Sequence, residues 1–472
     1  MTGSGGGRGR RIAAKAVRMG AAAWLMTGLP LSALMAQERG GLLRDALDLP
    51  ADIMLSGSIR ARYEALDGQA RAGFGAKDDL VSVRTTLFGE YRGDGFRVGG
   101  ELYDSRAYGA DAGSAIGTGE VNILELVQAY VVAQGVALPP LGGTADIQLG
   151  RFMLNLGSRR LIAADDYRNT TNGYSGARID FRGRGGIAAT AILVLPQQRR
   201  PDDIASIRDN RRAFDRENFN VKLWGGLIAR PGLFGRTMGE LSYFGLAERD
   251  QAGRPTRNRH LHTAGGRLIR EPATGSFDYE VEGFYQFGHV RASLAAAAAR
   301  LDVSAWFIHA DAGYSFPGPL KARLSIEYDR ASGDGRGPGF GRFDTLFGMR
   351  RADLAPAGIY AQIGRANIST PGIRLEVAPT KRLDAFVAWR AMWLAERTDA
   401  FSTSGVRDPS GRSGSFAGQQ LEGRLRWWVL PARLRAEANA AWIAKGRFLR
   451  RAPNAPRTGD THYLSLALTA SF

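Results

Sequence analysis

The stretch "KARLSIEYDR", from Lys321 to Arg330, alternates between apolar and polar side chains. Its odd positions are charged or polar, and its even positions are mostly apolar: Ala322, Leu324, Ile326 and Tyr328. Successive side chains of a β-strand point to opposite faces, so the pattern predicts a strand with one apolar and one ionic face. A soluble sandwich turns the ionic face outward to water, whereas a membrane barrel turns it toward an aqueous lumen. The rest of the chain must distinguish these two folds.

The same alternation recurs along the chain. It is clear in residues 53–64 ("IMLSGSIRARYE"), 277–287 ("FDYEVEGFYQF"), 421–429 ("LEGRLRWWV") and 432–442 ("ARLRAEANAAW"). No long helical periodicity interrupts it, and the composition does not change along the chain. The sequence therefore predicts a single all-β domain.

The segments between the expected strands alternate between long and short. The long ones cover residues 65–79, 107–120, 155–175, 196–217, 249–258, 291–301, 331–370, 396–418 and 447–460. Those between them are mostly short and rich in turn residues, such as "GDG" at 93 and "GRGG" at 183. Outer-membrane barrels have short periplasmic turns and long outer loops. The alternation predicts a transmembrane antiparallel β-barrel of about 18 strands, if 331–370 is one loop rather than a further strand pair.

The two ends of the chain agree with export to an outer membrane. Residues 1–36 combine a basic segment with a short, interrupted apolar run and are expected to be a signal peptide, because the run is too short to be a comfortable membrane anchor. Removing its five basic residues lowers the formal net charge from +17 to about +12. Residues 37–52 are then a short periplasmic segment and 53–472 the barrel. The alternating "HYLSLALTASF" ends on Phe472, which resembles the assembly signal of outer-membrane barrels.

Composition argues against several kinds of chemistry. The chain has no cysteine, which excludes disulfides, thiol nucleophiles and Cys-ligated zinc. Among its five histidines, only His260-x-His262 has ligand-like spacing, and without a nearby third ligand it is more typical of a polar strand surface. We therefore expect no metal, no cofactor and no enzymatic activity.

The charges expected to face the lumen are nearly balanced in number but separated in position. The acidic ones lie on strands near the middle of the chain: Glu240, Glu248, Asp278, Glu280 and Glu282. The basic ones lie on strands near its two ends: Arg60, Arg62, Arg84, Arg424, Arg426, Arg433 and Arg435. In a closed 18-stranded barrel the two sets face each other, and their transverse field suits a charged, hydroxyl-rich solute. Salt bridges that only rigidify the wall are the alternative interpretation.

Arginine supplies nearly all of the basic content. It binds carboxylates through two parallel hydrogen bonds, which fits a uronate, although a GC-rich genome would produce the same bias.

Three stretches resemble the alginate-export family of outer-membrane porins. They are "ELYDSRAYG" (101–109), "LGRFMLNLGSRRLIAADDYRNTTNGYSGARIDF" (149–181) and "FDTLFG" with "RANIS" (343–369). The resemblance spans nearly the whole mature chain. It implies a monomeric channel with an arginine-rich constriction that passes an anionic polysaccharide, and a role in that constriction for Arg159, Arg160 and Arg168.

Other functions stay open. A general small-solute porin would share this fold. A secreted polysaccharide-degrading enzyme would need paired carboxylates such as Asp165 and Asp166, but adjacent residues on a strand point to opposite faces. Trp427 in "GRLRWW" is phased toward lipid, which argues against a nucleic-acid site. The expected partners are outer-membrane lipid, an anionic polysaccharide or oligosaccharide and periplasmic polysaccharide-handling proteins.

Overall fold

The computed structural model describes residues 42–350 and 353–472, in which 18 β-strands form one sheet. The expected signal peptide, residues 1–36, lies outside the described residues. The strands are β1 (Ile53–Asp67), β2 (Lys77–Gly93), β3 (Phe96–Tyr108), β4 (Asn122–Leu138), β5 (Gly143–Met153), β6 (Gly173–Arg182), β7 (Ala188–Pro196), β8 (Val221–Phe234), β9 (Thr237–Glu248), β10 (His260–Arg270), β11 (Ser276–Arg291), β12 (Arg300–Ser315), β13 (Arg323–Ala331), β14 (Ile368–Thr380), β15 (Leu383–Trp393), β16 (Phe416–Leu430), β17 (Leu434–Lys445) and β18 (Thr461–Ser471).

Short helical segments accompany the strands. They are α2 (Leu42–Ala46), η2 (Pro139–Leu141), η3 (Arg184–Gly186), α3 (Ile204–Arg208) and α4 (Arg447–Arg451). Within the described part of the chain, no helix has the length and apolar character needed to cross a membrane.

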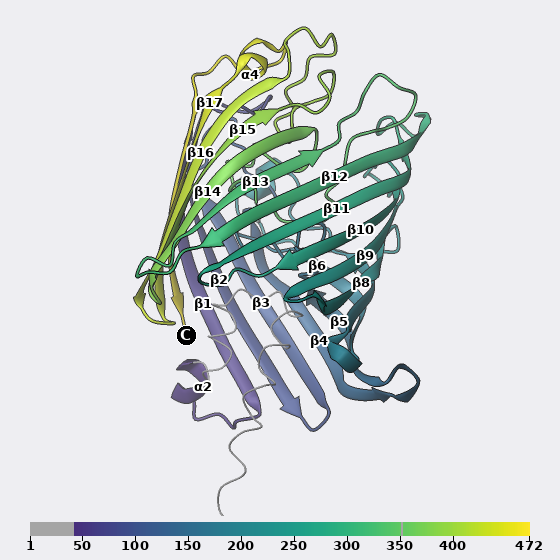
Figure 1. Cartoon of the computed structure of the whole chain (residues 1–472), viewed down its shortest axis with the longest axis vertical. Helices are drawn as coiled ribbons and strands as arrows, with labels where there is room; N and C mark the ends of the chain where they lie inside the picture. The colour runs from purple at the N-terminus through teal and green to yellow at the C-terminus, as the bar shows by residue number, and fades with distance from the viewer. Residues whose placement is uncertain (1–41, 351–352) are drawn as a thin grey trace, which may run out of the picture.

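The sheet closes into a barrel because β1 pairs with both β2 and β18 (Figure 1). The predicted strand number is confirmed, and residues 332–367 form a single connection between β13 and β14. Phe472 contributes to the closure, since its backbone exchanges hydrogen bonds of 2.8 and 3.0 Å with Gly57. A Cβ atom at Gly57 would lie 2.5 Å from the Phe472 ring, so only glycine allows this close approach.

Side chains alternate between the outer face and the lumen as the sequence predicts. In β13, Leu324 and Ile326 are 41% and 65% exposed, whereas Glu327 and Asp329 point inward and are buried. The ionic face therefore lines the lumen, and the apolar face surrounds the barrel. Lys321, which we expected on the lumen face of this strand, instead lies exposed in the preceding turn with a φ of 47°.

Long and short connections lie at opposite ends of the barrel (Figure 1). Those after odd-numbered strands are the longer ones, and the turns after even-numbered strands are short, as predicted. Arg433 lies in one of these turns, between β16 and β17, and its side chain is exposed. The prediction that Arg433 lines the lumen wall from a strand is therefore wrong, because the strand begins one residue later, at Leu434.

Aromatic side chains surround the histidines on the outer face of β8 to β11. The ring of His262 lies 6.1 Å from that of Tyr243 and 5.2 Å from that of Phe287, while His260 stacks on His289 at 4.6 Å. Aromatic residues collect where a barrel crosses the membrane–water interface. The His260-x-His262 pair is thus part of an aromatic belt.

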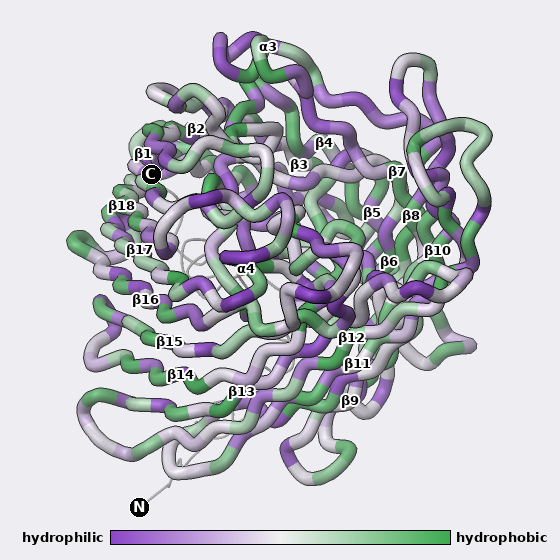
Figure 2. The backbone as a smooth tube through the Cα atoms, turned by 90° about the horizontal axis from the view of Figure 1, so that it is seen from above, coloured by the Kyte–Doolittle hydropathy of each residue, from purple (hydrophilic) through white to green (hydrophobic). Residues whose placement is uncertain are grey.

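The largest apolar core lies inside the barrel. It is built from lumen-facing wall residues and from two long connections, the β5–β6 loop (residues 154–172) and the β13–β14 loop (residues 332–367). Its members include Leu154, Ile162, Phe284, Phe307, Ile359 and Ile363. Seen from above, the chain crosses the space that the strands enclose (Figure 2). The hydrophobic effect therefore holds these loops inside the lumen.

Candidate functional site in the barrel lumen

The β5–β6 loop is attached to the basic side of the wall through its own backbone. Arg60 donates to the carbonyl oxygens of Asp166 and Arg168, at 3.0 and 2.6 Å. Arg62 donates to the carbonyl of Tyr167 and forms a 2.9 Å ion pair with Glu64. Arg60 and Arg62 face the lumen as predicted, but the loop covers them and leaves them 6% and 2% exposed. A solute in the lumen cannot reach them while the loop stays in place.

Arg84 contributes a third contact of the same kind, a 3.3 Å hydrogen bond to the carbonyl of Arg168. Its guanidinium also lies over the ring of Tyr103, 5.3 Å from the centroid. Three arginines of β1 and β2 therefore bind consecutive backbone carbonyls of one loop.

The same loop reaches the acidic side of the wall through Arg160. The guanidinium of Arg160 binds Glu282 at 2.7 Å and also contacts Glu280, both on β11. Two further hydrogen bonds, of 2.9 and 2.8 Å, join it to the carboxylate of Asp353. Burial would lower the pKa of Arg160, but these three carboxylates outweigh it and hold the pKa well above its usual value. The loop thus spans the lumen between the two charged walls.

Asp353 joins the β13–β14 loop to this arrangement. It binds Arg365 as well as Arg160, and the two guanidinium groups hold its pKa well below its usual range despite its burial. The backbones of the loops also pair, since Phe347 donates to the carbonyl of Leu161 at 2.9 Å. The two loops therefore form one unit inside the lumen.

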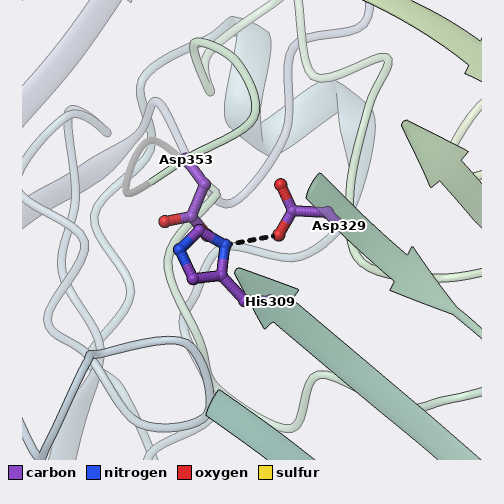
Figure 3. A group of neighbouring side chains, drawn as sticks. All are labelled: His309, Asp329 and Asp353. Atoms are coloured by element: carbon purple, nitrogen blue, oxygen red, sulfur yellow. Dashed lines mark hydrogen bonds and ion pairs between the residues drawn. The ribbon is translucent and has the colours of Figure 1, made fainter. Parts of the chain in front are cut away.

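His309, Asp329 and Asp353 lie together beside this unit (Figure 3). Nδ1 of His309 lies 2.8 Å from Oδ1 of Asp329. Among the described residues, this is the one group of three whose side chains could converge on a metal ion. Arg160 and Arg365 already neutralise Asp353, and their charges would repel a cation. We therefore interpret the group as part of a set of ion pairs between wall and loops, which we call the ionic lock. Its members are Arg160 with Glu280, Glu282 and Asp353, and Arg365 with Asp353.

The other predicted charges form local pairs along the wall. Arg424 and Arg426 share Asp384 at 3.2 and 3.0 Å, and Arg435 lies 3.8 Å from Glu437. On the acidic side, Glu248 binds Arg259 at 2.9 Å and Asp278 binds Arg323. Glu240 is buried against Gly157 of the β5–β6 loop. Many wall charges thus act as structural salt bridges, which was the alternative interpretation of the sequence.

The three arginines to which the family resemblance assigned a role in the constriction, Arg159, Arg160 and Arg168, have different surroundings. Arg160 forms the lock, whereas Arg168 pairs with Asp165 at 2.8 Å and faces an open cavity. Arg159 has a φ of 65°, and its carbonyl accepts a hydrogen bond from Met349. Asp165 and Asp166 lie in the β5–β6 loop and not on a strand, so the strand argument used for them in the sequence does not apply.

A cavity of about 920 Å³, which we call the vestibule, lies between these loops and the other long connections. Its lining contains three carboxylates, Glu248, Asp344 and Asp399, and seven arginines: Arg168, Arg199, Arg257, Arg259, Arg342, Arg350 and Arg365. Asp165 and Asp353, which lie outside the lining, pair with Arg168 and Arg365, so seven arginines meet five carboxylates. The remaining excess of two positive charges makes the vestibule electropositive, which favours anions.

Arg199, Arg257 and Arg350 differ from the other vestibule arginines. Within residues 42–350 and 353–472, none of the three forms an ion pair with a carboxylate, and Arg257 binds the carbonyl of Arg291 at 2.8 Å. Arg199 donates instead to Asn172 and, at 3.5 Å, to the carbonyl of Thr171. Burial and the nearby charge of Arg168 lower the pKa of both Arg199 and Arg350 to about 10. Both therefore stay protonated at neutral pH and retain donors for an anion.

Sequence reasoning did not single out Arg199, Arg350, Asp353 or Arg365. Arg365 opens the "RANIS" stretch that carried part of the resemblance, so that motif held a signal for it. The other three lie in long connections, where no periodicity reports which way a side chain points.

The closed 18-stranded barrel, its apolar outer face and its sorted loops define an outer-membrane channel of the porin class, which places the protein in the bacterial outer membrane. The family model for alginate export matches residues 52–461. The chain belongs to this alginate export family.

Similar solved structures are porins of Pseudomonas. OccK8 (OprE) of Pseudomonas aeruginosa has a TM-score of 0.57 at 11% identity, covering 89% of this chain and 98% of that one. A BenF-like porin of Pseudomonas fluorescens Pf-5 has a TM-score of 0.56 at 11% identity, covering 89% and 99%. OccK2 (OpdF) of Pseudomonas aeruginosa, in complex with glucuronate, has a TM-score of 0.54 at 13% identity, covering 89% and 96%. A comparison with curated protein sequences finds no match.

Proposed function

We propose that this channel passes an anionic, carboxylate-bearing carbohydrate, such as alginate or its oligosaccharides, by diffusion through its arginine-lined interior. The observation that carries the proposal is the vestibule, where seven arginines outnumber the five carboxylates that line the cavity or pair with those arginines. Membership of the alginate export family supports it. So does the similar fold of OccK2 (OpdF), a protein whose structure contains glucuronate.

The chemistry of the vestibule fits a uronate. A guanidinium binds a carboxylate through two parallel hydrogen bonds, and this planar match distinguishes arginine from lysine. Arg199 and Arg350 lie in a partly buried setting, so a carboxylate there is attracted more strongly than in bulk water. The charge that attracts the solute is spread over several loops, which favours successive weak contacts and diffusion rather than tight binding.

Small carboxylates are a second candidate class of solute. OpdK, a similarly folded porin of Pseudomonas aeruginosa, has been crystallised with vanillate. A general small-solute porin with this preference would pass monomeric anions and ignore the polymer.

Bilayer recordings separate these possibilities. The wild-type channel should prefer anions, and this preference should weaken at high salt because charges in water are screened within about 10 Å at 0.1 M. Uronate oligomers should reduce the current, whereas neutral oligosaccharides of similar size should not.

A double variant, Arg199→Gln with Arg350→Gln, should lose most of this preference and the oligomer effect while leaving the pore intact. The matched control is Arg208→Gln with Arg212→Gln, which removes two exposed charges from the loop that carries Arg199. A cation-selective wild-type channel, or one that is indifferent to uronates, would contradict the proposal.

A further inference from the structure

Five exposed arginines, which we call the outer arginine patch, gather around residues 405–414 of the β15–β16 loop. They are Arg336, Arg397, Arg407, Arg412 and Arg447. They come from three connections at the end of the barrel that carries the long loops, and Arg447 begins α4, which lies at that same end (Figure 1). The patch is therefore on the extracellular side.

Backbone contacts bring these arginines together. Arg336 donates to the carbonyls of Pro409 and Ser410, both at 3.2 Å. Arg447 donates to the carbonyl of Arg412 at 3.3 Å. Arg407 donates to the carbonyl of Thr398 at 2.8 Å, next to Arg397. Since carbonyl oxygens carry no net charge, these bonds position the guanidinium groups without neutralising them.

Carboxylates near the patch are occupied elsewhere. In the part of the chain that the structure describes, none of the five arginines forms an ion pair. Asp399 binds Arg342 at 2.6 Å, and Glu396 accepts hydrogen bonds from Thr398. Asp408 is buried beneath Ser410 and Ser413, whose hydrogen bonds hold its pKa well below its usual value. Even counting Glu396 and Asp408 as charged, the patch keeps a clear positive excess.

The patch is continuous with the vestibule. Asp399, Ser402, Thr403 and Gly405 line that cavity, and they belong to the same loop as Arg397, Arg407 and Arg412. Arg342, which also lines the vestibule, reaches into this loop through hydrogen bonds to the carbonyls of Ala400 and Ser402. A chain molecule that occupies the vestibule and extends outward would therefore pass beside the patch.

We propose that the outer arginine patch is a second binding site for an extended polyanion, which it holds outside the vestibule through several carboxylates of one chain. This inference rests on the proposed function and adds to it a second site, outside the vestibule, that contributes only to the binding of long chains. A monomer or short oligomer can occupy only one of the two sites. A long uronate chain can occupy both, and the second contact then acts at a high effective concentration.

Binding of uronate oligomers of graded length to the full-length protein in detergent micelles tests this proposal. The variant carries Arg336→Gln, Arg397→Gln, Arg412→Gln and Arg447→Gln. It keeps Arg407, whose 2.8 Å hydrogen bond to Thr398 is the shortest of the backbone contacts in the patch. A control variant removes four other exposed extracellular arginines: Arg208, Arg211, Arg212 and Arg249. Exposed ion pairs are individually weak, so the loss of four of them should make the patch variant bind long oligomers roughly tenfold more weakly.

The expected pattern is a loss that depends on oligomer length. The patch variant should bind long oligomers weakly and short ones like the wild type, and it should keep the wild-type anion preference in bilayers. Equal affinity for long oligomers in the patch variant and the wild type would overturn the proposal, as would an equal loss in the control variant.

A second arm replaces the oligomers with lipopolysaccharide. If the patch variant lost binding of lipopolysaccharide and kept that of long uronates, the patch would be a lipid site and the proposal would fail. The proposed function is measured separately, by the effect of uronates on the wild-type current. A channel that responds to uronates, with a patch that does not bind them, would refute the inference alone.

Discussion

The substitution Asp353→Asn tests whether the ionic lock holds the two inner loops in the lumen. Asparagine keeps the shape of the side chain but removes its charge. Arg160 would still have Glu280 and Glu282, whereas Arg365 would keep only its hydrogen bond to the carbonyl of Met349. The side chain of Arg365 is 1% exposed, so the variant leaves a buried guanidinium without a charged partner.

The expected effect is large. Removing one partner of a buried ion pair typically costs about 3 to 5 kcal/mol, because the remaining charge stays desolvated. Release of residues 353–366 from the core would let water reach Arg365 and recover this energy. Since about 1.4 kcal/mol corresponds to a factor of ten, the released population should increase by roughly a hundredfold or more.

Hydrogen exchange of the full-length protein in micelles measures that population. Amides in 353–366 should lose about two orders of magnitude of protection in Asp353→Asn, while those in the strands should not change. Single-channel recordings should show larger or noisier currents, since the same segment would move out of the lumen. The control Asp334→Asn lies in the same loop, where Asp334 accepts a 3.0 Å hydrogen bond from Gly341 and lacks a buried partner of this kind.

A double variant completes the test. Arg365→Met in the Asp353→Asn background removes the orphaned charge, so it should restore much of the protection. If Asp353→Asn exchanged like the wild type, or if the double variant were no better than the single one, the lock would not hold the loops. The wild-type lock should persist across mildly acidic and neutral pH. A carboxylate with a lowered pKa contributes stability above its unfolded pKa of about 3.9 and loses it only as pH falls through the lowered value.

Three further predictions concern the wall, the connection between β3 and β4, and the barrel as a whole. Leu425→Arg should impair assembly, because Leu425 is 48% exposed on the lipid face and arginine there costs up to about 2 to 4 kcal/mol. Arg426→Leu, on the lumen face of the same strand, should assemble and change conductance. Equal assembly yields of the two variants would contradict the assignment of these residues to the two faces. Burial and the nearby charge of Glu64 raise the pKa of Glu120 to about 7. The protonated Glu120 therefore contributes stability that is fully present below its unfolded pKa of about 4.3 and is lost as pH rises through about 7. Hydrogen exchange of residues 109–121 should therefore become faster over this pH range in the wild type, and a similar slope in Glu120→Gln would exclude Glu120 as the cause. The unheated protein should migrate faster on a gel than the heated one, as closed barrels often do, and identical migration would argue against a stable closed barrel.

The strands and their orientation were predictable because a barrel wall has a period of two. One side of each strand contacts lipid and the other faces the lumen, so Leu324 and Asp329 report their positions through their neighbours in the sequence. The number of strands followed from the sorting of the connections. Arg433 and Lys321 were misplaced because alternation continues into turns, where it no longer reports a direction.

The contents of the lumen could not be predicted in the same way. Arg60 was expected to meet solute, yet its partners are backbone carbonyls more than one hundred positions away. Arg160 and Asp353 are 193 positions apart. A backbone carbonyl has no signature in the sequence, and a loop that turns inward has the same composition as one that extends outward. Local patterns therefore predict the wall and leave the packing within it undetermined.

The attachment of the β5–β6 loop to Arg60, Arg62 and Arg84 has a consequence for how such a channel can diversify. These arginines bind main-chain oxygens of residues 166–168, and every amino acid supplies the same oxygen at those positions. The side chains there can mutate without loss of these particular contacts. Evolution can therefore change the side chains that contact the solute while the attachment of the loop to the barrel wall stays the same.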